Sequence, residues 1–317
     1  ALADQVRAAM ICEEARWDRT TVATFEGEVA NRTNNWFPDR SSRLLAHLRS
    51  VDLYPSIDAP MFAQHGGSIP SGGSISVTAT SGTIYYTVNG SDPRLLGGAI
   101  NGNAETYIGP IPIDAPLTVS ARAYNSSSGE WSALNSAFFS IDSEPASSSN
   151  LVISEIHYHP TEPSTVEELS ESTDRDDYEF VELFNVGAKA VDLTGVFFDD
   201  GISFVFPDNT LLASGARIVL VRDLAAFTVR YGALSPGVIA GQYTGRLSND
   251  GERLALSKNG TGVLHEVTYN DQLPWPTDAD GIGYSLLLVA PTSIPDHQLD
   301  TSWSAHAVIG GTPGVAD

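Results

Sequence analysis

Two runs in the middle of the chain alternate between apolar and polar positions in the manner of β-strands. Leu151–His157 and Tyr178–Asn185 are both rich in Val, Ile, Leu and Phe. In the second run apolar side chains alternate with Glu179 and Glu182, so we expect one apolar face and one face in contact with water. This alternation is typical of a small antiparallel β-sandwich.

The strand pattern continues to the end of the chain. One short helix is predicted from Leu224 to Tyr231, with Asp223 able to cap its first turn. Residues 161–177 form a long acidic insertion, which we expect to be a loop. Further strands are predicted at Val196–Phe198, Ser203–Phe206, Arg217–Val221, Arg253–Leu256, Val263–Tyr269 and Tyr284–Leu288.

Residues 51–145 show a second strand-rich pattern, in which Gly, Ser, Thr and Pro separate short β-rich runs. Asn89-Gly90 is a strong turn signal after one of these runs. Several strands within this length predict an Ig-like sandwich. The predicted strands are Ser74–Thr80, Thr83–Val88, Leu117–Tyr124 and Ala137–Ile141.

The first 50 residues have helical character. Ala1–Arg19 contains neither Gly nor Pro, and a second helix is predicted from Asp39 or Ser41 to Ser50. Two short helices bury little surface alone, so we expect them to belong to a domain that continues upstream in a longer protein.

The predicted fold class is therefore mainly β, with two Ig-like β-sandwich domains and a short N-terminal α-helical segment. The expected domains are a helical segment at 1–54, a sandwich at 55–142, a linker at 143–150 and a second sandwich at 151–317.

The charge of the chain is strongly negative and unevenly distributed. The formal net charge is −22, and residues 151–317 carry 24 acidic against eight basic residues. Such a surface repels nucleic acid and anionic lipid and favours divalent cations. No run approaches the ~18–20 apolar residues that span a bilayer, so we expect no nucleic-acid partner and no membrane insertion. The single cysteine, Cys12, excludes an internal disulfide and is interpreted as a buried structural thiol.

Acidic loops supply the best candidate sites. Calcium takes about six to eight oxygen ligands, which flexible acidic loops can provide. The Asp-x-Asp-Gly sequence at 278–281 is the most suggestive of these loops. Paired acids are also common on solvated loops that bind no metal. The candidate calcium ligands are Asp174, Asp176, Asp177, Asp199, Asp200, Asp278 and Asp280.

Other chemistry has weaker support. His157 and His159 could form a metal pair, but a strand-end pair is favoured because no third ligand is evident nearby. Trp131, Trp275 and Trp303 could stack on a sugar, although packing in a sandwich is favoured for each. No phosphate-binding glycine loop, G-x-S-x-G elbow or H-E-x-x-H motif occurs. We predict no catalytic residues and no cofactor other than calcium.

The C-terminal segment resembles a bacterial lamin-tail domain. The resemblance covers nearly all of residues 151–317 and rests on an ordered series of motifs: ISEIHYHP, DYEFVELFNVGAKAVDLTGVFFDDGISFVFP, ARIVLVRDLAAFTVRYG, GRLSNDGERLALSKNGTGVLHEVTYND, PWPTDADGIGYSLLL and GGTPG. It implies an Ig-like β-sandwich, and the family has no catalytic residues to transfer.

Two further segments carry resemblances. Residues 58–141, through GGSIPSGGSISVTATSGTIYYTVNGSDPR and PLTVSARAYNSSSGEWSA, resemble the non-catalytic C-terminal sandwich of chitobiase and β-hexosaminidase enzymes. Residues 1–50, through EEARWDR and WFPDRSSRLLAHLRSVDLYPS, resemble the C-terminal end of a CotH-type kinase domain. The nucleotide- and metal-binding residues of that family would lie upstream, so the resemblance implies no phosphotransfer activity for this chain.

The expected function is that of a non-catalytic structural, adhesion or assembly region in a large secreted or cell-surface bacterial protein. Its expected partners are other protein chains or cell-surface polysaccharide. Two alternatives remain open: carbohydrate-binding accessory modules of an upstream enzyme, and a self-assembling envelope or filament subunit with exposed edge strands.

Overall fold

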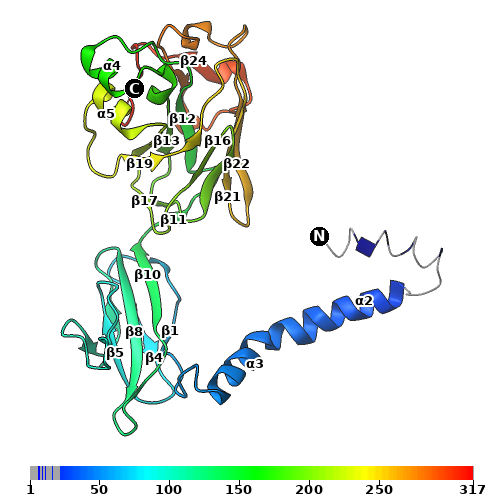
Figure 1. Cartoon of the computed structure of the whole chain (residues 1–317), viewed down its shortest axis with the longest axis vertical. Helices are drawn as coiled ribbons and strands as arrows, with labels where there is room; N and C mark the ends of the chain where they lie inside the picture. Colours follow the sequence, from blue (N-terminus) through cyan, green and yellow to red (C-terminus); the bar gives the residue numbers. More distant parts are fainter. Residues whose placement is uncertain (1–5, 8, 10, 12–15, 17–21, 317) are drawn as a thin grey trace. The chain divides into compact units, whose positions relative to one another are not determined.

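The computed structural model describes residues 6, 7, 9, 11, 16 and 22–316 (Figure 1). They divide into two compact units. The first comprises residues up to 65, 74–112 and 117–137, and the second comprises 66–73, 113–116 and 138 onwards. Most of the regular structure is β-sheet, which confirms the predicted fold class.

Helices precede the first strand. Among their residues none is buried, and Trp36 and Phe37 expose 41% and 58% of their surface. Within the described residues, no helix combines the length and apolar composition needed to cross a bilayer. The segments are α2 (Val22–Asn31), the π-helical η1 (Arg32–Trp36) and α3 (Phe37–Ser50).

The second predicted helix is confirmed as α3, which ends at Ser50 as expected. Helix α2 was not predicted, because Gly27 and several β-branched residues weaken its helical pattern. Cys12 and most of the predicted helix Ala1–Arg19 lie outside the described residues.

The first β-rich region forms one six-stranded sheet and two strand pairs. The sheet runs β2-β10-β8-β5-β6 with β9 beside β8, and the pairs are β1-β4 and β3-β7. Val119, Phe139 and Ile113 are fully buried. The strands are β1 (Met61–Phe62), β2 (Gly67–Ile69), β3 (Ser74–Ile75), β4 (Val77–Thr78), β5 (Thr83–Thr87), β6 (Glu105–Thr106), β7 (Ile111–Pro112), β8 (Leu117–Asn125), β9 (Glu130–Trp131) and β10 (Asn135–Ile141).

The C-terminal region contains the larger sandwich. One sheet runs β19-β18-β13-β12-β23-β24, the other runs β20-β16-β15-β21-β22, and a small sheet runs β11-β14-β17. The strands are β11 (Glu144–Pro145), β12 (Leu151–His157), β13 (Phe180–Asn185), β14 (Val191–Asp192), β15 (Val196–Asp200), β16 (Ile202–Val205), β17 (Leu211–Leu212), β18 (Arg217–Val221), β19 (Ile239–Gln242), β20 (Thr244–Gly245), β21 (Arg253–Lys258), β22 (Gly262–Thr268), β23 (Leu286–Leu288) and β24 (Trp303–Ala305).

Short helices complete this region. The main apolar core of the C-terminal region joins residues of both large sheets, such as Ile153, Leu183, Phe198 and Leu256. Each of the eight strands predicted here overlaps a strand of the structure. The helices are α4 (Val166–Glu171), η2 (Arg175–Tyr178), α5 (Leu224–Tyr231), η3 (Thr277–Ala279), η4 (Pro291–Ser293) and η5 (Asp300–Ser302).

Helix α5 confirms the predicted helix at its predicted bounds. The Asp223 carboxylate accepts a hydrogen bond from the N–H of Ala226 (2.9 Å), and Gly232 follows the last turn. The acidic insertion is partly helical rather than a loop. Thr165 and Glu168 form a reciprocal capping box at the start of α4, a spacing that sequence inspection can detect.

The expectation of a wet face on β13 is wrong. Every residue of β13 is buried, and Glu179 and Glu182 are 0% exposed. The outer face is covered because Phe180 packs with Phe227 of α5 in a second apolar cluster. Helix α5 therefore forms an additional layer on one face of the sandwich (Figure 1).

Residues 143–150, which we expected to be a linker, carry strand β11. Glu144 and Pro145 pair with Val191 and Asp192 of β14. The side-chain amide of Asn150 donates to the Pro145 carbonyl (3.0 Å). This segment therefore has regular backbone pairing within the second unit.

Asn185 holds the corner at the end of β13. Its buried amide nitrogen donates to the carbonyls of Lys189 (2.8 Å), Leu212 (2.8 Å) and Ala213 (3.0 Å). Its amide oxygen accepts from the N–H of Gly187 (2.8 Å). One side chain thus satisfies backbone groups from two loops.

We expect Asn185→Ala to lower the free energy of unfolding by on the order of 3 kcal/mol, because buried carbonyls lose their donor. Urea unfolding of the purified chain measures this change. The control is Asn259→Ala at an exposed asparagine, which should stay within about 0.5 kcal/mol of the parent. Equal stability of Asn185→Ala and the parent would contradict the assigned role.

Candidate functional site

Two buried glutamates lie opposite each other on the central strands. Glu155 of β12 and Glu182 of β13 are register partners, and both are 0% exposed. Glu182 forms an ion pair with Arg217 (Nε–Oε1, 3.1 Å) and accepts hydrogen bonds from Ser154 Oγ (2.6 Å) and the N–H of Gly314 (2.8 Å). The carboxylates are therefore buried against neighbouring segments of the chain and do not face a substrate cleft.

Glu155 binds a second segment. Its Oε1 accepts a hydrogen bond from Ser285 Oγ (2.5 Å). Gly311 lies so close that a Cβ there would stand 1.9 Å from the same oxygen. The positive φ of Gly311 (72°) adds a second reason for glycine at this position. The closing GGTPG motif is thus fitted against the two glutamates.

Glu179 is buried immediately before the first residue of β13. Its Oε2 accepts from the Tyr243 hydroxyl (2.9 Å) and from the N–H of Leu247 (2.9 Å). Burial is the main cause that raises the pKa of Glu179 to about 8, and it outweighs these two hydrogen bonds. A raised carboxyl pKa can mark catalysis, but the 0% exposure of this side chain leaves no access for a substrate.

The first predicted acidic cluster is held by arginine. Arg222 lies 3.9 Å from Asp174, 3.9 Å from Asp176 and 3.3 Å from Asp177 between charged atoms. Arg246 adds a second ion pair to Asp176 (3.3 Å). The structure does bring these three acids together, with guanidinium groups as their cations.

The two other clusters are also partly paired. Asp200 forms an ion pair with Arg253, whereas Asp199 is exposed. Asp280 Oδ1 lies 2.6 Å from Nδ1 of His159, and Asp278 is exposed on η3. Over the described part of the chain, no group of three or more His, Cys, Asp or Glu residues is placed to hold a metal ion. Calcium binding stays a prediction.

The two histidines near the end of β12 have separate environments. His157 is buried, and burial lowers its pKa to about 3. His159 lies beyond the strand between Asp280 and Arg175, whose Nη1 is 3.0 Å from His159 Nε2. The favoured interpretation as a strand-end pair agrees with this placement.

The three tryptophans proposed as sugar platforms are packing residues, as favoured. Trp131, Trp275 and Trp303 are buried. The indole N–H of Trp131 donates to the Gly98 carbonyl (2.8 Å), and that of Trp303 donates to the His297 carbonyl (2.9 Å).

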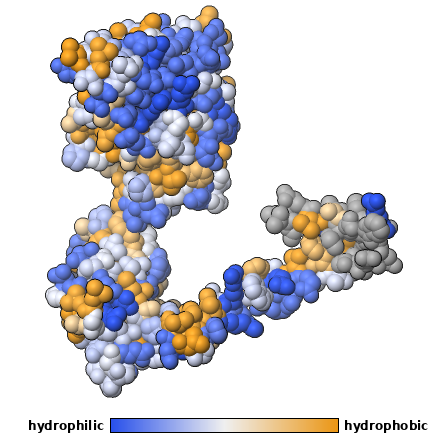
Figure 2. Space-filling model, viewed as in Figure 1, coloured by the Kyte–Doolittle hydropathy of each residue, from blue (hydrophilic) through white to orange (hydrophobic). Residues whose placement is uncertain are grey.

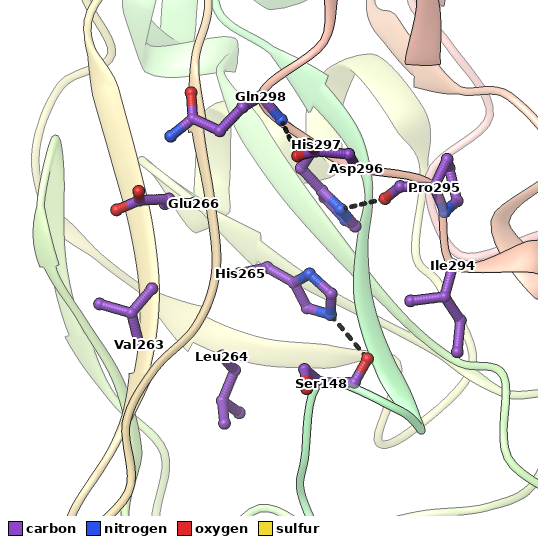
Figure 3. A pocket seen from close by; sticks show the side chains of 10 residues that line it. All are labelled: Ser148, Val263, Leu264, His265, Glu266, Ile294, Pro295, Asp296, His297 and Gln298. Carbon is purple, nitrogen blue, oxygen red and sulfur yellow. Dashed lines mark hydrogen bonds between the residues drawn. The ribbon is translucent and has the colours of Figure 1, made fainter.

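A groove of about 520 Å³ lies beside β22, and no pattern in the sequence indicates it (Figure 3). Its walls include residues 263–266 of β22 and residues 294–298. The rings of His265 and His297 stack within it, with centroids 4.2 Å apart. His265 donates to the Ser148 carbonyl (3.1 Å), and His297 donates to the Pro295 carbonyl (2.9 Å). Both rings are thereby fixed.

These features describe a β-sandwich region whose polar interior serves its architecture. Comparisons with known proteins agree. A family model described as Lamin Tail Domain matches residues 144–271, and one described as Fn3 associated matches residues 74–137. The first match supports the lamin-tail resemblance over that range. Both domain types are non-enzymatic, and no catalytic family is indicated. The chitobiase-type and CotH-type resemblances are not confirmed and stay predictions.

Similarity to individual proteins is limited. No curated protein matches the chain. A solved structure described as a DUF4876 family protein from Bacteroides thetaiotaomicron VPI-5482 is 13% identical, with a TM-score of 0.30. That alignment covers 60% of this chain and 73% of the other.

Glu179→Gln should change how stability depends on pH. The folded chain holds the Glu179 proton more tightly than the unfolded chain, so stability falls as pH rises from about 4.5 to about 8 and is level above. Glutamine does not ionise, so the variant does not lose stability in this way as pH rises. We expect it to match the parent near pH 5 and to exceed it by on the order of 2–4 kcal/mol at pH 8.5. Urea unfolding at both pH values measures this, with the exposed Glu171→Gln as control. Parallel pH profiles of parent and Glu179→Gln would refute the assignment.

The calcium prediction is tested by thermal melting. If the Asp278 loop binds calcium, millimolar calcium chloride should raise Tm by several degrees over EDTA, because a ligand of the folded state stabilises it. Asp278→Asn should remove the shift, whereas Asp208→Asn at an exposed acid outside the three clusters should keep it. Superimposable curves with calcium and EDTA would reject the prediction.

Proposed function

We propose that this chain is a non-catalytic adhesion or assembly region of a large secreted or cell-surface bacterial protein. The observation that carries the proposal is the use of the buried polar groups. Glu155, Glu179 and Glu182 are all 0% exposed and bind other parts of the same chain. With these groups committed to architecture, loops and strand edges remain for interaction with partners.

The surface chemistry supports an extracellular structural role. The net charge of −22 keeps such a chain soluble and disfavours binding to nucleic acid. Figure 2 shows a broad hydrophilic area on the visible face of the C-terminal unit. Partners of the proposed region are other protein chains or cell-surface polysaccharide.

The two alternatives have less support. A carbohydrate-binding module needs exposed aromatic rings, and Trp131, Trp275 and Trp303 are buried. A self-assembling subunit would bring strongly acidic copies together, which like-charge repulsion opposes.

The remaining resemblances refine the proposal. The exposed apolar side chains of η1 and α3, such as Trp36, Phe37 and Leu44, fit a segment that packs against another domain, as the CotH-type resemblance implies. The first sandwich would then be a chitobiase-type spacer. Neither assignment gives this chain a phosphotransfer or glycosidase activity.

The proposal predicts that the parent protein is accessible from outside intact cells. Antibody raised against this chain should detect the protein in the medium or on the cell surface, and proteinase K added to intact cells should remove the surface signal. A cytoplasmic marker protein should survive the same treatment. Protection of the chain until the cells are lysed would overturn the proposal. Retention of the purified chain on insoluble polysaccharide, with no binding to protein partners, would instead favour the carbohydrate alternative.

A further inference from the structure

Strand β22 leaves one of its edges open. It is the terminal strand of its sheet and pairs with β21 alone among the described strands. The N–H of Tyr269 donates to the carbonyl of Glu252 (3.1 Å), so these two residues form a hydrogen-bonded pair. Bonded and non-bonded pairs alternate along an antiparallel ladder. Glu266 and Thr268 therefore direct their backbone N–H and C=O groups away from β21.

The groove with the stacked histidines runs along this open edge. Residues 263–266 form one wall and residues 294–298 form the other (Figure 3). The backbone of the second wall is unusual at Ile294. This residue has a positive φ (52°), a conformation that residues other than glycine seldom adopt. At about 3.4 Å per residue, the five residues from Leu264 to Thr268 offer an edge of roughly 17 Å. That length suits one short extended peptide.

The rim of the groove is acidic. Glu266 and Asp200 share the guanidinium of Arg253, and Asp296 is exposed on the opposite wall. The rim thus carries three carboxylates and one arginine, a net negative charge. Burial lowers the pKa of both groove histidines, that of His297 to about 4, so neither ring offsets this charge at neutral pH.

We propose that the β22 edge binds an extended segment of another protein that carries lysine or arginine, by adding it to the sheet as a further strand. Main-chain hydrogen bonds to Glu266 and Thr268 supply the affinity, and the acidic rim selects the charge. A second copy of this chain fits poorly, because its net charge is −22. The inference rests on the proposed function and names the chemistry of its partner.

A synthetic peptide tests the site directly. The probe is a fluorescein-labelled eight-residue peptide of alternating valine and lysine or arginine, and the comparison peptide has glutamate in place of every cation. We expect the cationic peptide to bind the full chain at micromolar to submillimolar concentrations, with affinity that falls with added salt. Amide hydrogen exchange should slow at Glu266 and Thr268. The anionic peptide should do neither.

Matched variants separate the backbone from the charge. Thr268→Pro deletes an N–H that points away from β21, which an edge strand tolerates, and should weaken binding at least tenfold. Thr268→Ala keeps that N–H and should bind as the parent does. Asp296→Asn should weaken binding about three- to fivefold, whereas Asp208→Asn, at an exposed acid outside the groove, should not. Thermal melting checks that each variant is folded.

Some results would overturn the inference. These are an absence of binding at millimolar peptide, equal binding of the anionic peptide, or exchange protection confined to other segments. The exchange measurement uses the parent chain, so it decides the matter even if Thr268→Pro does not fold. If the peptide fails while the parent protein remains accessible on cells, only this inference is rejected and the proposed function stands.

Discussion

The structure depends on a sheet that is buried on both faces while it carries acidic side chains. β12 and β13 have no exposed residue, yet they include Glu155 and Glu182 side by side. A buried carboxylate is costly unless it is paired or hydrogen bonded. Each one therefore requires a partner from another segment, and the requirement fixes where those segments lie. Arg217, Ser285 and the 310–314 turn occupy their positions for this reason.

This constraint also explains the extra layer on the sandwich. A conventional antiparallel sheet can leave one face in water. Here the outer face carries Phe180 beside Val219 and Val221, which must be covered. Helix α5 supplies Phe227, whose ring meets Phe180 edge-on at 6.0 Å between centroids. Arg230 of the same helix forms an ion pair with Glu168 of α4 (2.7 Å). The acidic insertion therefore packs against this layer.

Local signals in the sequence predicted the elements well. The bounds of α5 follow from Asp223 and Gly232, and those of β12 and β18 follow from short runs rich in Val, Ile and Leu. The burial of Glu182 could not be predicted, because it depends on a glycine more than 100 residues away in sequence. The same holds for the acid clusters. Arg222 is nearly 50 residues from Asp174, and no local pattern indicates that they meet.

The groove beside β22 illustrates the remaining gap between sequence and site. His265 and His297 are far apart in the sequence, and each looks like an isolated polar residue there. They meet because β22 ends one sheet and the segment after η4 crosses beside it. An open edge normally invites pairing between identical chains, and charge is a common way to prevent it. An acidic rim prevents self-pairing only through repulsion between like charges, and the same rim attracts a cationic strand. Protection from self-association and selection of a basic partner are thus two consequences of one arrangement of carboxylates.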